Sequence, residues 1–218
     1  MWKWILPTFA ILLLTPFSGN IDLSVAKYAQ GIYQGQPFYQ FFYYYGLYLG
    51  FIPFAAGAVM IVLSYLKPSY LPFRKAGWLL VLVFLIVPGL LVNALFKEHW
   101  GRPRPRQVVE FGGEYPFYPY YQPTFHKYSE PMKSFPSGHA TMGFYYFALA
   151  IAGKRLRCRW LHISGYLLAF SLGIALAVTR IVMNGHFLTD VVFSGYICWM
   201  VTLAVEWLLY ERAYKTTK

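Results

Sequence analysis

The sequence predicts an all-α protein, a bundle of six transmembrane helices. Apolar residues make up 58% of the 218 residues and charged residues 12%, whereas a soluble domain carries about twice that charge. The apolar residues also fall in blocks that approach or exceed the roughly 20 helical residues needed to cross a bilayer. Only a helix satisfies its own backbone polar groups in lipid. A large soluble helical core is excluded because too little polar surface remains to cover it.

Six apolar blocks form the predicted bundle: Trp4–Phe17, Phe41–Leu66, Gly77–Phe96, Ser137–Gly153, Trp160–Thr179 and Phe187–Tyr210. The first block is short, and Trp2-Lys3 before it resembles the start of a signal peptide. No clear small-x-small cleavage pattern follows the block, so we expect a retained helix. We find no internal repeat and no separate soluble domain, which predicts one domain over residues 1–218.

Basic residues gather at alternate ends of these blocks. Eleven of the 19 Lys and Arg residues, including Lys67, Arg74 and Arg155, fall at one set of ends together with only two acids. The positive-inside rule assigns this set to the cytoplasm, with both termini inside. The net charge of +11 therefore indicates membrane topology, and we expect no nucleic-acid partner. Cys158 in a cytoplasmic loop and Cys198 in the last block are predicted to be free thiols.

The longest polar stretch, residues 97–136, falls on the opposite, outer side. It holds seven of the 14 prolines, so no regular helix is expected through it. Its aromatic residues between Tyr115 and Tyr128 are typical of a membrane interface. Both an anchoring belt and a lid for an amphiphilic substrate fit this composition.

Three short polar motifs fall at block ends, and the alternation of the blocks puts all three on the outer face. The motifs are Lys97 to Arg104-Pro105, Pro136-Ser137-Gly138-His139, and Thr179-Arg180 followed by His186 and Asp190. Each motif alone is common at a helix end. Their agreement on one face and at one depth predicts a single shared site.

The residues of this site suit a phosphate group. Lys97, Arg104 and Arg180 supply positive charge, and an arginine can grip phosphate in a bidentate fork. Ser137 offers a hydroxyl donor. Gly138 opens an apolar helix, whose first N–H groups point toward anions. Phosphoryl transfer depends mainly on such positioning and charge stabilisation.

His139 and His186 are the candidate catalytic pair. One imidazole can attack phosphorus while the other protonates the leaving oxygen. Asp190 follows His186 by four residues, on the same helix face, where a carboxylate can hold one ring nitrogen. This spacing predicts His186 as the nucleophile and His139 as the general acid.

These motifs resemble those of the type-2 phosphatidic acid phosphatase (PAP2) family, which are Lys-x6-Arg-Pro, Pro-Ser-Gly-His and Ser-Arg-x5-His-x3-Asp. One departure is Thr179, where the family usually has serine. The resemblance implies a bacterial inner-membrane lipid phosphatase with its active site at the periplasmic ends of the helices. It implies a phosphohistidine at His186, assisted by Asp190, with His139 as acid. The implied phosphate contacts are Lys97, Arg104, Ser137, Gly138 and Arg180. The resemblance also implies that no metal or other cofactor is needed.

Other polar residues have less defined roles. We expect His99 and His126 to be exposed in the outer loop and His162 to be structural. Arg102 and Arg106 flank the motif arginine, and they are expected either to bind a second phosphate or headgroup or to be solvated. A metal site would need clustered ligands at suitable spacing, which only the two motif histidines approach.

The expected substrate is a phosphorylated envelope lipid, and no obligate protein partner is evident. Lipid A comes first, because the run 97–113 resembles bacterial members that act on envelope lipids, including lipid A phosphatases. Undecaprenyl diphosphate, phosphatidylglycerol phosphate and phosphatidic acid follow. A lipid phosphotransferase using the same site is the alternative. Vanadium haloperoxidases have a similar anion pocket but are soluble, and a transporter would not need two histidines with an orienting carboxylate.

Overall fold

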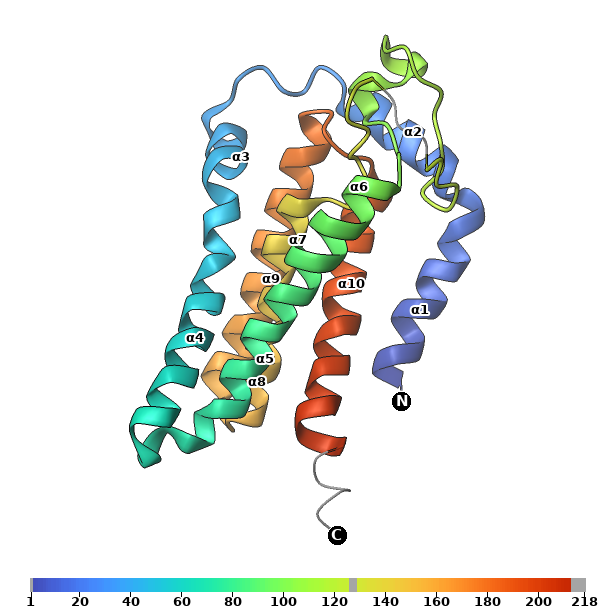
Figure 1. Cartoon of the computed structure of the whole chain (residues 1–218). Helices are drawn as coiled ribbons and strands as arrows, with labels where there is room; N and C mark the ends of the chain where they lie inside the picture. The colour runs from blue at the N-terminus through green and yellow to red at the C-terminus, as the bar shows by residue number, and fades with distance from the viewer. Residues whose placement is uncertain (1, 126–128, 213–218) are drawn as a thin grey trace.

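The protein is described by a computed structural model that covers residues 2–125 and 129–212, and over these ranges it contains helices and turns but no strands. Its α-helices are α1 (Trp2–Leu14), α2 (Ser18–Ala29), α3 (Pro37–Leu49), α4 (Phe51–Leu66), α5 (Arg74–Phe84), α6 (Lys97–His99), α7 (Gly138–Phe144), α8 (Tyr146–Arg155), α9 (Arg159–Val182) and α10 (Leu188–Glu206). The long helices run side by side as a bundle (Figure 1). The predicted all-α fold is confirmed.

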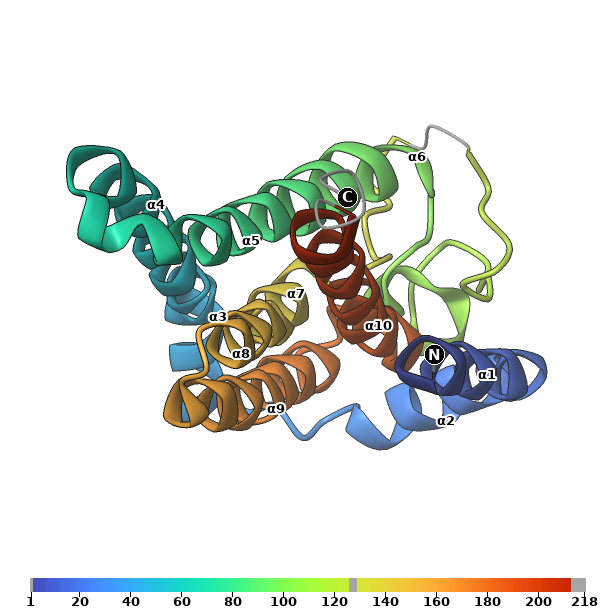
Figure 2. The same ribbon diagram turned by 90° about the horizontal axis from the view of Figure 1, so that it is seen from below.

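Five helical stretches of the described chain are long and apolar enough to cross a membrane: Trp2–Ala29, Pro37–Leu66, Pro68–His99, Arg159–Val182 and Leu188–Glu211. The fourth predicted block is absent from this set because it is broken at Tyr145 into α7 and α8. The Tyr145 hydroxyl donates to the Leu80 carbonyl at 2.7 Å and so joins the break to α5. Seen along the bundle, α7 and α8 lie between α5, α9 and α10 (Figure 2).

The first predicted block continues beyond Phe17 into a second helix. A 3₁₀ turn, η1 (Thr15–Phe17), contains Pro16, and α2 leaves it at an angle to α1 (Figure 1). The buried residues of α2 are Ser18, Asp22, Ala26 and Ala29. Side chains join α1 to α10, since the hydroxyls of Thr8 and Tyr196 lie 3.1 Å apart. The first predicted block is therefore followed by α2, which lies at the end of the bundle away from the start of α1 (Figure 1).

The second half of the third predicted block is a π-helical segment, η3 (Leu85–Phe96), between α5 and α6. Pro88 lies inside this segment and has no N–H to donate, so one backbone hydrogen bond of a regular α-helix is missing there. The Asn93 side chain donates to the Pro88 carbonyl at 2.7 Å. The segment ends immediately before Lys97, which begins α6 at the same end of the bundle as α2 (Figure 1).

Glycine residues allow α7 to pack closely against α9. A Cβ on Gly143 of α7 would lie 2.5 Å from the backbone nitrogen of Gly173 in α9, so only glycine fits there. Such close approach is typical of helix pairs in membranes, where van der Waals contact drives association. Because α7 begins at the second motif and α9 ends at the third, this packing fixes the distance between those two motifs.

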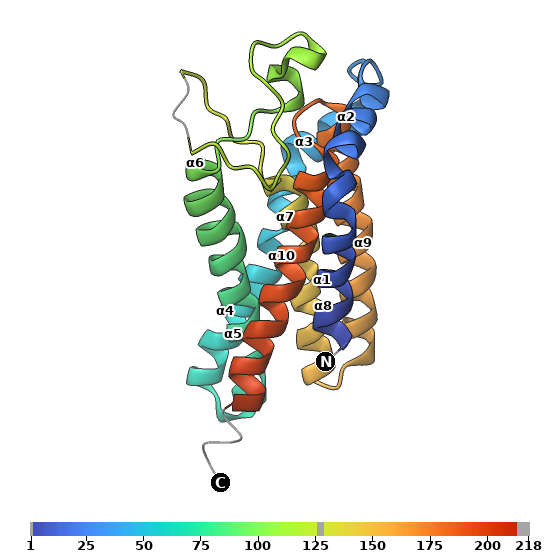
Figure 3. The ribbon, with the colours of Figure 1, turned by 90° about the vertical axis from the view of Figure 1, so that its right-hand side faces the viewer.

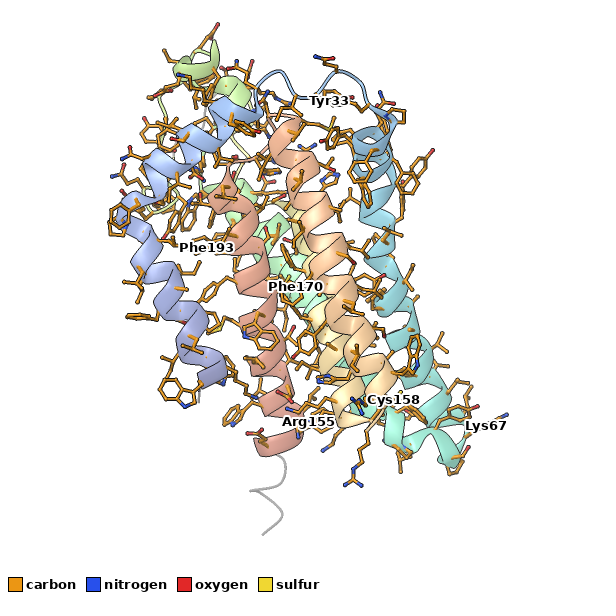
Figure 4. The ribbon with its side chains drawn as sticks, turned by 180° about the vertical axis from the view of Figure 1, so that it is seen from behind. Tyr33, Lys67, Arg155, Cys158, Phe170 and Phe193 are labelled. Atoms are coloured by element: carbon orange, nitrogen blue, oxygen red, sulfur yellow. The ribbon has the colours of Figure 1, made fainter. Side chains whose placement is uncertain are left out.

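The two ends of the bundle differ in composition. Lys67, Arg155 and Cys158 lie together at one end, and Tyr33 lies at the other (Figure 4). The first end also holds Glu206, which is 1% exposed and pairs with both Lys3 and Arg155. The loop after α6 covers the opposite end (Figure 3), and its only helical segments are the 3₁₀ turns η4 (Pro105–Gln107) and η5 (Val109–Phe111) in the part described. Both cysteines are free, as predicted.

Candidate active site

The three predicted motifs meet at the loop-covered end. Lys97 begins α6, Ser137 precedes α7, Arg180 lies in the last turn of α9 and Asp190 in the first turn of α10. The backbone N–H of Ser137 donates to the Asp190 carbonyl at 3.2 Å, so the second and third motifs are bonded directly. All eight predicted site residues therefore belong to segments that converge at one end.

The turn between α9 and α10 sets the place of His186. Asn184 adopts a left-handed conformation with φ of 50°, which ends α9 as such residues commonly do. The N–H of Gly185 then donates to the Arg180 carbonyl at 2.9 Å, and a Cβ on Gly185 would lie 2.3 Å from an Arg180 nitrogen. Glycine at this turn therefore makes room for the Arg180 guanidinium beside His186.

His186 is 3% exposed, and its orientation differs in detail from the prediction. Nδ1 lies 2.6 Å from the Ser134 carbonyl oxygen but 3.6 Å from the Asp190 carboxylate, which is too long for a hydrogen bond. A carbonyl only accepts, so Nδ1 carries the proton and Nε2 keeps its lone pair. Burial lowers the pKa of His186 to about 4 despite the opposing effect of Asp190. The ring is therefore neutral near pH 7, the form in which an imidazole has a lone pair available for reaction.

Asp190 is fully buried and bonds the residues that surround His186. Its Oδ2 accepts hydrogen bonds from the Ser134 hydroxyl at 2.6 Å and from the Phe187 N–H at 2.8 Å. Its Oδ1 pairs with Arg102. The carboxylate thus positions the Ser134 segment, whose carbonyl orients the imidazole. Sequence reasoning missed Ser134, since a serine two residues before the second motif carries no signal by itself.

The site has more cationic charge than it can pair internally. Within the described residues, Lys97, Arg104 and Arg180 form no ion pair with a carboxylate, and the buried Nε atoms of Arg104 and Arg180 have no hydrogen-bond partner. Burial, and then the neighbouring Arg106, lower the pKa of the Arg104 guanidinium. Uncompensated buried cations are costly, so this cluster is suited to an anion.

Ser137 and Gly138 shape the floor of this cluster. The Ser137 hydroxyl accepts from the Ala140 N–H at 3.4 Å as the cap of α7, which leaves its hydrogen available to an anion. A Cβ on Gly138 would lie 2.8 Å from the Lys97 ammonium, so the glycine is what allows Lys97 to lie over the start of α7.

His139 lies on Tyr43 of α3, a residue that the sequence did not single out. The two rings stack with centroids 5.5 Å apart, and His139 Nε2 lies 3.0 Å from the Tyr43 carbonyl oxygen. Nε2 is thus the donor here, and Nδ1 is the nitrogen left for the substrate. The Arg180 guanidinium also lies over the Tyr43 ring, 4.9 Å from its centre. Tyr43 comes from a run of aromatic residues that resembles an interface belt, which hid its role.

A groove of about 280 Å³ leads from the site into the apolar region. It is lined by Leu47, Phe51, Phe84, Pro88, Asn93, Lys97, Gly138, His139 and Met142. Lys97 and His139 form its polar end, and the rest is lined by Asn93 and by apolar side chains of α3, α4, α5, η3 and α7. This is the shape needed for a group with a charged end and an apolar tail.

The expectation for Arg102 was wrong. Its side chain is 1% exposed and bonds Asp22, Asp190, Thr189 and the Tyr118 carbonyl, so it is neither solvated nor a headgroup contact. Arg106 is exposed. His99 is exposed as expected, and His162 bonds the Ala150 carbonyl at 2.8 Å in a structural role. His126 and Tyr128 lie outside the described residues.

These features define a class of protein: a helical membrane protein with a cationic pocket and two histidines at one end of its bundle. The chain belongs to the PAP2 superfamily, whose model matches residues 77–214. It is accordingly a membrane-embedded phosphatase, a hydrolase.

Two curated proteins similar to the chain are both described as lipid A 4'-phosphatases. A lipid A 4'-phosphatase of Francisella tularensis subsp. novicida (strain U112) is 32% identical over 206 residues, covering 88% of each chain. A lipid A 4'-phosphatase of Rhizobium leguminosarum is 37% identical over 122 residues, which cover 56% of this chain and 48% of the relative. No solved structure matches the chain.

Proposed function

We propose that the protein hydrolyses a phosphate monoester or diphosphate of a bacterial envelope lipid, with lipid A as the preferred substrate. The observation that carries this proposal is the group of unpaired cations, Lys97, Arg104 and Arg180, in the same pocket as a neutral, oriented His186. The name of the two relatives supports lipid A. The groove beside Lys97 and His139 supports a lipid over a soluble phosphate ester.

The proposed reaction has two steps. The lone pair of His186 Nε2 attacks phosphorus, the bond from phosphorus to the leaving oxygen breaks, and protonated His139 gives that oxygen its proton. A water molecule then attacks the phosphohistidine, gives a proton to His139, and the phosphorus–nitrogen bond breaks to free inorganic phosphate. The cations and the Ser137 hydroxyl stabilise the charge that develops on the phosphoryl oxygens. The mechanism uses no metal, and the described residues hold no group of three or more metal-ligating side chains.

The lipid preference is tested by phosphate release from purified protein with four substrates: lipid A, undecaprenyl diphosphate, phosphatidylglycerol phosphate and phosphatidic acid. We expect kcat/KM for lipid A to exceed the other values by at least about tenfold, equivalent to about 1.4 kcal/mol. Activity should persist in EDTA and should not require an added acceptor lipid.

Arg106→Ala provides the control on specificity, because Arg106 is the exposed arginine beside the cluster. A larger loss of kcat/KM for lipid A than for phosphatidic acid in this variant supports a headgroup contact.

Equal kcat/KM values of the wild-type protein for all four lipids would indicate a general lipid phosphatase. Strict dependence of turnover on an acceptor lipid would favour the phosphotransferase alternative.

We further propose six membrane crossings in one domain, in the bacterial inner membrane, with the site facing the periplasm and no obligate protein partner. The sixth crossing is α7 with α8, because residues 138–155 as a helix span roughly 27 Å, close to the hydrocarbon thickness of about 30 Å. Basic residues at the opposite end support a cytoplasmic assignment for that end (Figure 4).

Cysteine labelling in spheroplasts is the test of this orientation. Native Cys158 is exposed at the basic end and should react with an impermeant maleimide only after lysis. Val109 is 62% exposed in the outer loop, and Val109→Cys in a Cys158→Ser background should react in intact spheroplasts. The reverse pattern would invert the topology.

A further inference from the structure

Asp22, in α2, is a fully buried carboxylate that neither the motifs nor the PAP2 match includes, because the match begins at residue 77. It accepts three hydrogen bonds: from Arg102 Nη2 at 2.7 Å, from the Thr189 N–H at 2.8 Å and from the Thr189 hydroxyl at 2.6 Å. Three donors and no acceptor is the bonding pattern of an ionised carboxylate. Thr189 lies in the first turn of α10, so Asp22 also caps that helix from another one.

Arg102 links Asp22 to the active site. Its Nη1 donates to Asp190 and to the Thr189 hydroxyl, its Nη2 to Asp22, and its Nε to the Tyr118 carbonyl at 3.0 Å. The guanidinium is therefore shared between two buried carboxylates that are far apart in the sequence. Every nitrogen of the side chain has a partner, which fixes its position.

The group formed by Asp22, Arg102 and Asp190 has more negative than positive charge, and this excess lies close to His186. Two carboxylates face one guanidinium, so Asp22, Arg102 and Asp190 together carry one net negative charge. Asp190 lies 3.6 Å from His186 Nδ1. When Nε2 bonds to phosphorus and Nδ1 keeps its proton, the imidazole becomes positive, and a nearby carboxylate stabilises it strongly in a buried site.

We propose that Asp22 is a positioning residue for phosphoryl transfer, which acts through Arg102 on Asp190. By taking a share of Arg102, it keeps the negative charge of Asp190 effective on the imidazole of His186. It also holds the guanidinium at the distance that places Asp190 and Ser134. This inference rests on the phosphohistidine mechanism proposed above.

The test is Asp22→Asn in the full chain, since asparagine has the same shape but no charge. We expect kcat to fall about 30-fold with KM within about threefold, the scale of outer groups that orient catalytic ligands. In an Asp190→Asn background the same change should cost less than about twofold, because residues that act through one another are not additive. The matched control is Glu206→Gln, which neutralises a buried carboxylate shared by Lys3 and Arg155 at the other end and should keep kcat within about twofold.

Each outcome decides the proposal. A kcat for Asp22→Asn within threefold of wild type, or an undiminished loss in the Asp190→Asn background, overturns it. Asp22→Glu restores the charge and should recover part of kcat. If neither Asp22 variant can be purified in folded form, Asp22 serves folding alone and the proposal also fails. His186→Asn in the same assays distinguishes failure of the phosphohistidine mechanism from failure of the inference about Asp22. An active His186→Asn variant contradicts the mechanism. An inactive His186→Asn variant together with wild-type activity of Asp22→Asn contradicts only the inference about Asp22.

Discussion

His186→Asn is expected to lower kcat by at least about 10⁴-fold, the scale seen when a covalent nucleophile is removed. Asparagine can still donate its side-chain N–H toward the Ser134 carbonyl, which His186 Nδ1 contacts at 2.6 Å. It has no nitrogen lone pair at the place of Nε2. The variant therefore removes the proposed nucleophile while keeping the bond that orients it. Turnover and acid-quenched trapping of phosphoprotein measure the effect.

His162→Asn is the matched control for this prediction. His162 also has Nδ1 against a backbone carbonyl, that of Ala150 at 2.8 Å, but it lies in the first turns of α9 at the opposite end. We expect kcat within about twofold of wild type for this variant. Phosphoprotein trapped in His186→Asn, or more than a tenth of wild-type kcat, would move the nucleophile to another residue.

Arg180→Met should lower kcat by about 10²- to 10³-fold and leave the thermal stability of the protein unchanged or higher. Arg180 is 5% exposed, its Nε has no partner, and it lies in the same cluster as Arg104. Without a bound anion these like charges repel, so an apolar side chain of similar volume relieves a cost. In substrate turnover the same charge stabilises the phosphoryl oxygens. Activity and Tm in detergent should therefore change in opposite directions, or Tm should stay constant.

Arg74→Met is the matched control, because Arg74 also stacks on a tyrosine, 4.2 Å from the Tyr65 ring centre. Unlike Arg180 it is satisfied, with bonds to the Ser64 hydroxyl and carbonyl at 3.1 Å. Its loss should lower Tm and spare kcat. Vanadate should raise the Tm of wild type but not of Arg180→Met. If Arg180→Met lost stability in proportion to activity, the guanidinium would be structural and the anion-pocket interpretation would fail.

The helical fold and the meeting of the motifs at one end were predictable from the sequence. Long apolar blocks in lipid allow only helices, and their alternation decides which ends meet. The fifth block also predicted its helix closely, with Trp160–Thr179 against α9 at Arg159–Val182. The break at Tyr145 was not predicted; the hydroxyl of this residue bonds the Leu80 carbonyl in another helix, a contact that no pattern along the block records.

The sequence by itself determined which polar side chains fall at the ends of the apolar blocks and so meet at one end of the bundle, because motif spacing along a helix is a local property. Only the tertiary structure decided how those side chains are held. His186 is oriented by the carbonyl of Ser134, 52 residues away, and Arg102 pairs with Asp22 across 80 residues. The sequence left Arg102 either as a headgroup contact or as a solvated residue, whereas packing buries it between two carboxylates. Burial and long-range pairing depend on which helices touch, and no pattern along one segment records that.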